Sequence, residues 1–275
     1  MTQRSILITG CSSGIGLASA KMLRERGWRV LATARRSEDL ERLRTQDHFE
    51  ALHLELADPA SIAACASEVL RLTDGKLDAL FNNAAYGQPG AVEDITAETL
   101  RRQLDVNVIG THDLTRRLIP AMRANKSGRI VNCSSVLGMM AVPFRGAYCA
   151  SKFALEGLTD SLRLELAGTG IHVSLIEPGP IRTRFVDNAL AAAKASVDIE
   201  GSVHRERYHR MIESLARGGK QTFKLEPEAV ALKLVHAVES ARPKPRYYVT
   251  VPTHLAGFLR RILPTRLLDI AAVRG

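Results

Sequence analysis

Eight consecutive residues near the amino terminus decide the fold, namely TGCSSGIG at positions 9–16. They end the first predicted strand, residues 5–9, and start a predicted helix over residues 14–26. A strand, a glycine loop and a helix in this order bring backbone N–H groups and a helix amino terminus to a pyrophosphate. Glycines also form plain turns, but glycines that join the very first strand to a helix favour phosphate binding. The sequence therefore predicts a dinucleotide-phosphate site at Gly10, Ser12, Ser13, Gly14, Ile15 and Gly16.

Apolar, β-branched runs alternate with helical patterns through most of the chain. Continuous apolar strands between helices are typical of a parallel sheet covered on both faces. The sequence therefore predicts one α/β domain over residues 1–275, a doubly wound, mostly parallel sheet of the Rossmann type, whose ligands bind beyond the carboxyl ends of the strands. Further strands are predicted over residues 29–33, 51–54, 79–82, 129–133, 172–176 and 247–251, and further helices over residues 39–44, 59–72, 97–124, 148–168 and 227–241.

Two regions break this alternation. Residues 184–225 are charged and too long for an ordinary connection, which predicts a substrate-binding loop region. The tail, residues 254–275, mixes apolar residues at near-helical spacing with arginines, and Pro264 divides it into two predicted short helices. Such a tail can lie on a membrane surface, cover the substrate pocket or meet a second subunit. We favour the two packing interpretations, and hence a homo-oligomer (dimer or tetramer) with at most peripheral membrane contact.

Composition narrows the class of protein. The chain has 275 residues, of which 45% are hydrophobic and 24% charged, which is ordinary for a globular protein and excludes a fibrous or disordered one. A net charge of +9 favours anionic partners such as a phosphorylated cofactor, a membrane surface or nucleic acid. The basic residues are dispersed along the chain, so we predict no nucleic-acid partner.

The predicted compartment follows from the cysteines and the amino terminus. The four cysteines are scattered and form no C-x-x-C pair, which predicts reduced thiols in a cytoplasmic protein. The amino terminus lacks the long apolar region of a signal peptide, and no stretch of the chain has the continuous apolar length of a membrane span.

The second predicted strand indicates which dinucleotide binds. In NAD-binding proteins an acidic residue at the end of this strand holds the ribose 2′-hydroxyl. Here the strand is followed by Arg35 and Arg36, with no carboxylate between Leu31 and Arg36. Guanidinium groups suit a 2′-phosphate, although two solvated loop arginines would give the same sequence. The sequence therefore predicts NADP as the cofactor.

A second constellation lies in SSVLGMMAVPFRGAYCASK, residues 134–152. Tyr148 and Lys152 are four residues apart at the start of a predicted helix, so their side chains share one face. Ser135 follows a predicted strand at its carboxyl end, where ligands bind. A nearby ammonium lowers the pKa of a phenol, which otherwise is about 10, and a serine hydroxyl can orient a substrate oxygen. These side chains fit carbonyl reduction, in which the developing alkoxide takes up a proton.

The ordered motifs resemble the short-chain dehydrogenase/reductase family. They are the TGxxxGxG loop, Asn-Asn-Ala at 82–84, the Ser135 hydroxyl and the Tyr-x-x-x-Lys pair at 148–152, and the similarity is strong over residues 5–185. The run at 148–166 looks most like the subgroup of hydroxysteroid and retinol dehydrogenases and related bacterial carbonyl reductases.

This resemblance implies a role for each residue of the motifs. Tyr148 would be the general acid/base, Lys152 would lower its pKa and hold the nicotinamide ribose, and Ser135 would orient the carbonyl. Asn107 would hold a proton-relay water against Lys152; the alternative is a helix residue that bonds its own backbone. Further cofactor contacts are implied for Asn83 and Ala84 near the adenosine ribose, Asp58 at the adenine, and Pro178, Gly179, Ile181 and Thr183 at the nicotinamide.

The resulting prediction is an NADP(H)-dependent oxidoreductase that interconverts an apolar carbonyl, ketone or aldehyde, and its alcohol. The alternative is a non-catalytic NADP-binding sensor or scaffold on the same fold, since fold alone does not set function. The histidines are scattered, so we predict no catalytic metal. An apolar substrate wall is predicted from Ala85, Tyr86, Val136, Leu137, Met139, Met140, Val142, Pro143, Phe144 and Phe185, some of which can instead pack in the core.

Overall fold

Parallel strands form one sheet in the order β3-β2-β1-β4-β5-β6-β7. This computed structural model describes residues 3–216 and 222–274. The order of the strands reverses between β1 and β4, so the predicted doubly wound sheet is confirmed, with its switch point where the glycine loop leaves β1. The strands are β1 (Ser5–Ile8), β2 (Arg29–Ala34), β3 (Glu50–His53), β4 (Ala79–Asn82), β5 (Gly128–Cys133), β6 (Ile171–Glu177) and β7 (Arg246–Tyr248).

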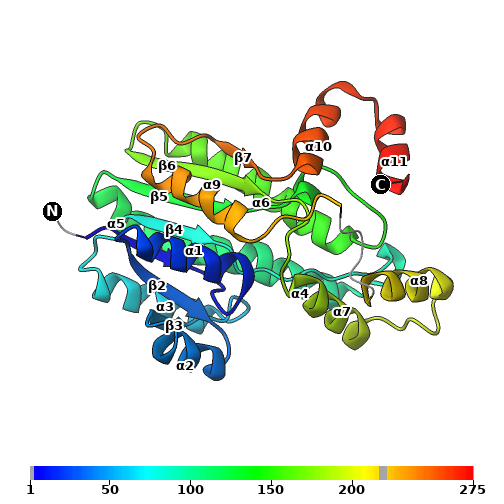
Figure 1. Ribbon diagram of the computed structural model, residues 1–275, viewed down its shortest axis with the longest axis horizontal. Helices are drawn as coiled ribbons and strands as arrows, with labels where there is room; N and C mark the ends of the chain where they lie inside the picture. Colours follow the sequence, from blue (N-terminus) through cyan, green and yellow to red (C-terminus); the bar gives the residue numbers. More distant parts are fainter. Residues whose placement is uncertain (1–2, 217–221, 275) are drawn as a thin grey trace.

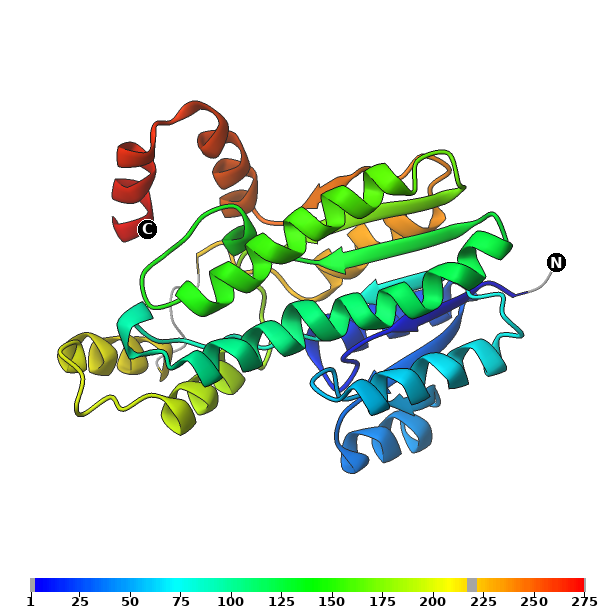
Figure 2. The ribbon, with the colours of Figure 1, turned by 180° about the vertical axis from the view of Figure 1, so that it is seen from behind.

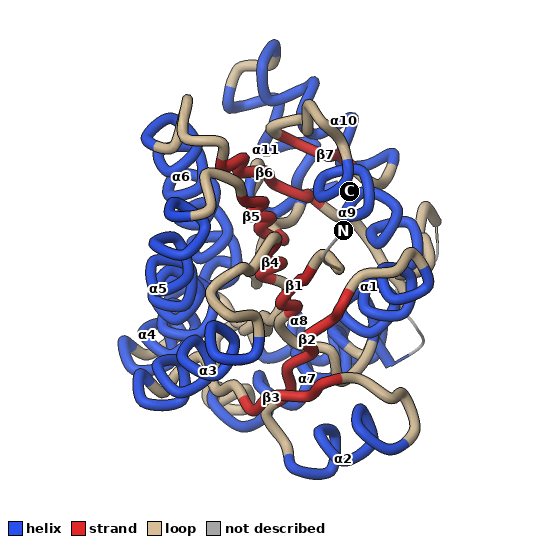
Figure 3. Tube along the Cα trace, turned by 90° about the vertical axis from the view of Figure 1, so that its left-hand side faces the viewer, coloured by secondary structure: helices blue, strands red, loops and turns tan. Residues whose placement is uncertain are grey.

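Helices cover both faces of the sheet, as Figure 3 shows edge-on, with α3–α6 on one side and α1 and α9 on the other. Alternate residues of β1 explain the two layers. Ile6 and Ile8 face the core with α1 and α9, whereas Leu7 faces the core with α3 and α5. The helices of these layers are α1 (Gly14–Glu25), α2 (Ser37–Thr45), α3 (Pro59–Leu72), α4 (Ala97–Leu104), α5 (Thr111–Ala124), α6 (Gly146–Glu165) and α9 (Glu228–Glu239).

The single helix predicted over residues 97–124 is wrong at its centre. A π-helical segment, η2 (Asp105–Gly110), separates α4 from α5. Gly110 lies so close to the Leu56 carbonyl that a Cβ there would stand 2.0 Å from its oxygen. The wider turn brings the chain to this contact, and π segments are frequent at functional sites. Apolar periodicity does not reveal one wide turn inside a long helix.

The strand predicted over residues 247–251 is also too long. β7 ends at Tyr248, and Val251 is the first residue of the next helix, α10 (Val251–Ile262). Pro252 stands in the first turn of this helix, where proline is favoured. The apolar character of Val249 and Val251 therefore misplaced the end of the strand.

The two regions that break the alternation lie beyond the carboxyl ends of the strands, where Figure 1 shows them to the right of the sheet. The predicted substrate-binding loop region contains two helices, α7 (Phe185–Ser196) and α8 (Arg205–Ala216), while its residues 217–221 lie outside the described residues. The tail forms α10 and α11 (Thr265–Arg274), so the predicted division at Pro264 is confirmed. Figure 2 shows this helical pair projecting from the body.

Helix α10 presents two different faces. Thr253, Ala256 and Gly257 are buried against the body. The opposite face exposes large apolar side chains at helical spacing, namely Val251, Leu255, Phe258 and Ile262. Within residues 3–216 and 222–274 no helix combines the length and the apolar character that crossing a bilayer requires.

Candidate active site

The glycine loop joins β1 to α1 in the predicted way. Gly10 has φ +73° and Gly14 φ +56°, a region that side chains rarely adopt. A Cβ on Gly16 would stand 2.2 Å from the Gly10 carbonyl oxygen, so only glycine lets helix and loop approach. No side chain caps α1 at Ser13, and its first turn carries no acidic residue. Its N–H groups therefore offer an anion site.

Asn83, which directly follows the neighbouring strand β4, holds this loop in place through hydrogen bonds. Its Nδ2 donates to the Thr9 carbonyl at 2.9 Å, and the N–H groups of Asn83 and Ala84 both donate to Thr9 Oγ1 at 2.9 Å. A Cβ on Gly10 would stand 2.9 Å from the Ala84 Cα. The predicted residues Asn83 and Ala84 are thus brought to the glycine loop, where they fix its shape.

Arg35 and Arg36 follow the carboxyl end of β2, where the sequence places them. Arg35 Nη1 lies 3.5 Å from Glu55 Oε2, and the Arg35 side chain is 58% exposed. Arg36 pairs with Glu38 at 3.3 Å and is also exposed. Both guanidinium groups therefore lie at the surface near the adenosine end of the predicted site, each beside a carboxylate.

Another arginine, which was not predicted, contacts the glycine loop. Arg42, in α2, donates a hydrogen bond to the Ser12 carbonyl and pairs with Asp39 at 3.1 Å. Its position one turn into a helix gives no sequence signal, because the contact joins residues 30 apart. Asp58, predicted at the adenine, accepts a hydrogen bond from the Ala60 N–H at 2.9 Å and so caps α3.

The predicted catalytic side chains gather between β5 and the first turns of α6. Ser135 follows β5 and begins the short helix η3 (Val136–Gly138), where its Oγ accepts from the Leu137 N–H at 3.1 Å. Lys152 Nζ donates to the Cys133 carbonyl at 2.7 Å and lies 5.7 Å from the centre of the Tyr148 ring. Lys152 is only 3% exposed, and Tyr148 is 8% exposed.

The predicted lowering of the Tyr148 pKa is not what the structure shows. Burial raises the pKa of the Tyr148 phenol above its ordinary value, while hydrogen bonding to Ser135 and the charge of Arg145 oppose this. Burial also lowers the pKa of the Lys152 ammonium. The desolvation penalty of a buried phenolate is larger than its stabilisation by Ser135 and Arg145, so the phenol stays protonated at neutral pH.

Asn107 lies in the π segment with its side-chain amide already engaged. Its Nδ2 donates to the Tyr86 carbonyl at 2.9 Å and to Ser151 Oγ at 3.1 Å, and its Oδ1 accepts from the Tyr86 N–H at 3.1 Å. The amide thus fixes the loop that carries Tyr86. Among the hydrogen bonds of the described residues, none joins Asn107 directly to Lys152.

The segment predicted for the nicotinamide closes over both halves of the site. The Pro178 carbonyl accepts from the Val136 N–H at 2.8 Å, beside Ser135. A Cβ on Gly14 would stand 2.8 Å from the Thr183 Cγ2, so this segment touches the glycine loop. A Cβ on Gly179 would stand 2.1 Å from Thr250 Oγ1, which allows no side chain there.

The predicted apolar wall is divided by the fold. The Phe185 ring lies 5.4 Å from the Tyr148 ring, and Gly87 packs against both. Phe144, in contrast, packs against Tyr208 of α8 at 5.0 Å and belongs to a small separate core. Phe185 thus lies beside the phenol, whereas Phe144 anchors the helical insertion.

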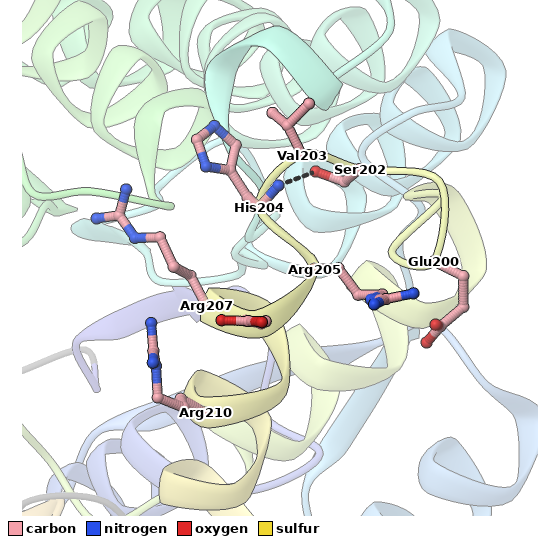
Figure 4. Close-up of a pocket in the computed structure, with 8 residues that line it drawn as sticks. Glu200, Ser202, Val203, His204, Arg205, Arg207 and Arg210 are labelled. Carbon is pink, nitrogen blue, oxygen red and sulfur yellow. Dashed lines mark hydrogen bonds between the residues drawn. The ribbon is translucent and has the colours of Figure 1, made fainter.

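A charged pocket of about 500 Å³ lies outside this centre, at the start of α8. Figure 4 shows the side chains of Arg207 and Arg210 directed to the same side of the helix, and Arg205 and Glu200 also line the pocket. The predicted catalytic residues do not line it. The four cysteines are buried and unpaired. In the described part of the chain, no three His, Cys, Asp or Glu side chains gather where they could hold a metal ion.

Comparison with known proteins agrees with the class that the fold and site define, an oxidoreductase with a nicotinamide cofactor. The family model for short chain dehydrogenases matches residues 4–194, so the chain belongs to the short-chain dehydrogenase/reductase family. It is 45% identical to the Escherichia coli oxidoreductase YbbO over 97% of this chain and 93% of that protein. It is 37% identical to human 17-beta-hydroxysteroid dehydrogenase type 1 (91% of this chain, 78% of that protein) and 33% identical to human retinol dehydrogenase 16 (98% and 87%).

Solved structures share the whole fold. The actinorhodin polyketide ketoreductase with NADPH has a TM-score of 0.72 at 29% identity and covers 90% of this chain and 95% of that one. A short-chain dehydrogenase/reductase from Burkholderia phymatum in complex with NAD has a TM-score of 0.79 at 27% identity, covering 98% and 94%. The neighbours thus include complexes with either dinucleotide.

Proposed function

We propose that the protein reduces apolar ketones or aldehydes with NADPH and catalyses the reverse oxidation of their alcohols. The observation that carries this proposal is the meeting of Ser135, Tyr148 and Lys152 at the carboxyl edge of the sheet. The glycine loop lies at the same edge, where the missing side chain of Gly16 lets the loop and helix α1 approach closely, and the amino terminus of α1 has no side-chain cap. These features fit a bound dinucleotide.

The residues present divide the chemistry among themselves. Bound NADPH supplies the hydride. Ser135 donates a hydrogen bond that holds the substrate oxygen near Tyr148, and the Tyr148 hydroxyl gives its proton to that oxygen. The Tyr148 phenol is in the acid form that reduction requires at neutral pH, and burial, which raises its pKa, disfavours the phenolate. Lys152 has three donors, one of which is held by the Cys133 carbonyl, so its ammonium is fixed beside the phenol.

NADP is the proposed cofactor because Arg35 and Arg36 follow β2 where an NAD-binding protein carries an acid. The apolar side chains near Tyr148, above all Phe185, support a lipid-like substrate such as a steroid, retinoid or fatty aldehyde. The names of the hydroxysteroid and retinol dehydrogenases to which the chain is similar support the same class.

We also propose a cytoplasmic homo-oligomer, a dimer or tetramer, with at most peripheral membrane contact. Four buried, unpaired cysteines support a reducing compartment. The exposed apolar face of α10 supports a protein partner for the tail, since exposed contiguous apolar surface marks interaction sites. No nucleic-acid partner is proposed.

The test is NADPH consumption by the purified protein with a panel of steroid, retinoid and aliphatic carbonyls, repeated with NADH. Turnover of apolar carbonyls that prefers NADPH supports the proposal. A protein that binds NADPH tightly but turns over none of the panel is instead the sensor or scaffold on the same fold.

A further inference from the structure

Three carboxyl groups surround one guanidinium behind the catalytic residues. Arg246, at the start of β7, donates from Nη1 to Glu156 Oε2 and to Glu177 Oε1, the latter at 2.5 Å, and from Nη2 to Asp160 Oδ2 at 2.6 Å. Glu177 is 0% exposed and the Glu156 side chain 9%. Asp160 has a second arginine partner, Arg163. Two buried carboxyl groups therefore depend on one guanidinium.

Two carboxyl oxygens of this cluster lack a hydrogen-bond donor unless the cluster holds an extra proton. Glu156 Oε1 and Glu177 Oε2 are buried and have no donor. Buried polar atoms are rarely left unpaired, and two close carboxylates seldom both ionise. Burial and the neighbouring Glu156 raise the pKa of Glu177 to about 8. One carboxylate, one carboxylic acid and one guanidinium are then present at neutral pH.

Glu156 connects this cluster to the catalytic lysine. It stands one helical turn after Lys152 in α6, and its charge raises the pKa of Lys152, against the effect of burial. Its Oε1 also lies 3.0 Å from where a Gly138 Cβ would stand, and Ser134 Oγ lies 2.6 Å from the same point. Glu156 thus contacts the short helix that Ser135 begins.

Glu177 connects the cluster to the nicotinamide segment. It is the last residue of β6 and directly precedes Pro178, whose carbonyl accepts from the Val136 N–H. Arg246 lies on the neighbouring strand β7, where Tyr248 pairs with Glu177 in register. Through Glu156 and Glu177 the Arg246 guanidinium is therefore linked to three segments that build the site, namely α6, the turn after β6 and η3.

We propose that Glu156, Glu177 and Arg246 are positioning residues, a buried cluster with one shared proton that holds Lys152 and the turn at Pro178 in register for cofactor binding. This inference rests on the proposed function, because Lys152 and Pro178 matter only if a dinucleotide binds. The charged and titratable groups around the carboxyl pair and Lys152 are Asp160 and Arg163 of α6, Arg246 of β7 and, beside Lys152, Cys133 of β5.

The shared proton predicts how stability depends on pH. The pKa of Glu177 is raised from 4.5 to about 8, so the folded protein binds a proton that the unfolded chain releases between these values. The stabilisation is complete below pH 4.5 and is lost as pH rises through 8. Glutamine at position 177 mimics the protonated acid and has no proton to lose.

The experiment measures NADPH affinity by fluorescence and melting temperature from pH 6 to 9.5, for the wild type and three variants. Glu177→Gln keeps the affinity at pH 7 within about twofold and removes the fall in melting temperature that the wild type shows as pH rises from 6 to about 8. Arg246→Met weakens NADPH binding by at least about tenfold, since misplacing site residues by a fraction of an ångström is costly. Glu156→Gln shifts the alkaline limit of NADPH binding to lower pH, because Lys152 loses a nearby negative charge.

The matched control is Arg26→Met, because Arg26 pairs with a carboxylate, Glu239, at the opposite end of the strands. It leaves NADPH affinity unchanged. Wild-type affinity in Arg246→Met, or a wild-type melting profile in Glu177→Gln, overturns the inference. If Arg246→Met does not fold, the isosteric Glu177→Gln still decides. A wild type that binds neither NADPH nor NADH refutes the proposed function instead. In that case, the dependence of melting temperature on pH still tests whether the cluster holds a shared proton.

Discussion

The arginine after β2 offers a direct test of cofactor choice. Replacing Arg35 with aspartate removes a guanidinium from the end of β2 and places a carboxylate beside Glu55, which now lies 3.5 Å from the arginine. A 2′-phosphate then meets two negative groups instead of one ion pair. We expect Arg35→Asp to weaken NADPH binding and to leave NADH binding nearly unchanged.

The magnitude follows from the exposure of the site. A charge-assisted hydrogen bond contributes about 1.5–3 kcal/mol, and the lower value applies because Arg35 is 58% exposed. The new carboxylate adds repulsion of about 1 kcal/mol at roughly 4 Å in water. Together these give about 2.5 kcal/mol, or a loss of roughly 50- to 100-fold in NADPH affinity.

The assay is titration of both reduced cofactors into wild type, Arg35→Asp and Arg71→Asp, with fluorescence as the signal. Arg71 is an exposed arginine that pairs with Glu68 near the carboxyl end of α3, so its variant carries the same charge change away from the site. An additional variant, Glu55→Gln, frees Arg35 and should tighten NADPH binding. Equal NADPH affinity in the wild type and Arg35→Asp, or a wild type that prefers NADH, would refute the NADP assignment.

Three further variants probe the other parts of the site. Tyr148→Phe keeps the ring contact with Phe185 but lacks the proton donor. Its kcat should therefore fall about 100- to 10,000-fold, while its NADPH affinity stays within about twofold of the wild type. Wild-type turnover by this variant would show that Tyr148 is not the proton donor. Gly16→Ala places a methyl group 2.2 Å from a carbonyl oxygen. This clash should lower the free energy of unfolding by about 1–3 kcal/mol, measured by thermal melting, and weaken NADPH binding. Gly157→Ala is the control, because the space around Gly157 is open and neither quantity should change. Truncation after Thr253 should alter KM or assembly, measured by light scattering, more than cofactor affinity; loss of liposome binding with unchanged assembly and kinetics would instead favour a membrane role for the tail.

The sequence pattern predicted most of the sheet because each strand is encoded by a short stretch of consecutive residues. Each strand is a short apolar run between helices, and alternate residues of β1 already belong to two different core layers. The π segment around Asn107 was missed because one wide turn leaves the apolar pattern almost unchanged. Helices α7 and α8 were missed because their region is charged and its packing depends on Phe144, far away in the chain.

The site was predictable where spacing alone sets geometry. Tyr148 and Lys152 share a helix face, and the glycine loop is one short segment. The pKa of Tyr148 was predicted with the wrong sign, because burial of its ring depends on the folded surroundings. The cluster at Arg246 was invisible for the same reason, since its contact with Glu156 joins residues 90 apart in sequence.

The reactivity of the buried cysteine thiols can be used to measure local opening of the fold. Cys11 lies in the layer with α1, and Cys65 in the layer with α3, and burial raises the pKa of each thiol to about 12. A thiol reacts as its thiolate, so neither should be labelled while its layer is closed. The rates at which the two cysteines accept an alkylating reagent therefore measure, separately, how often each face of the sheet loses its helices. Added NADPH should protect Cys11, which belongs to the glycine loop, more strongly than Cys65.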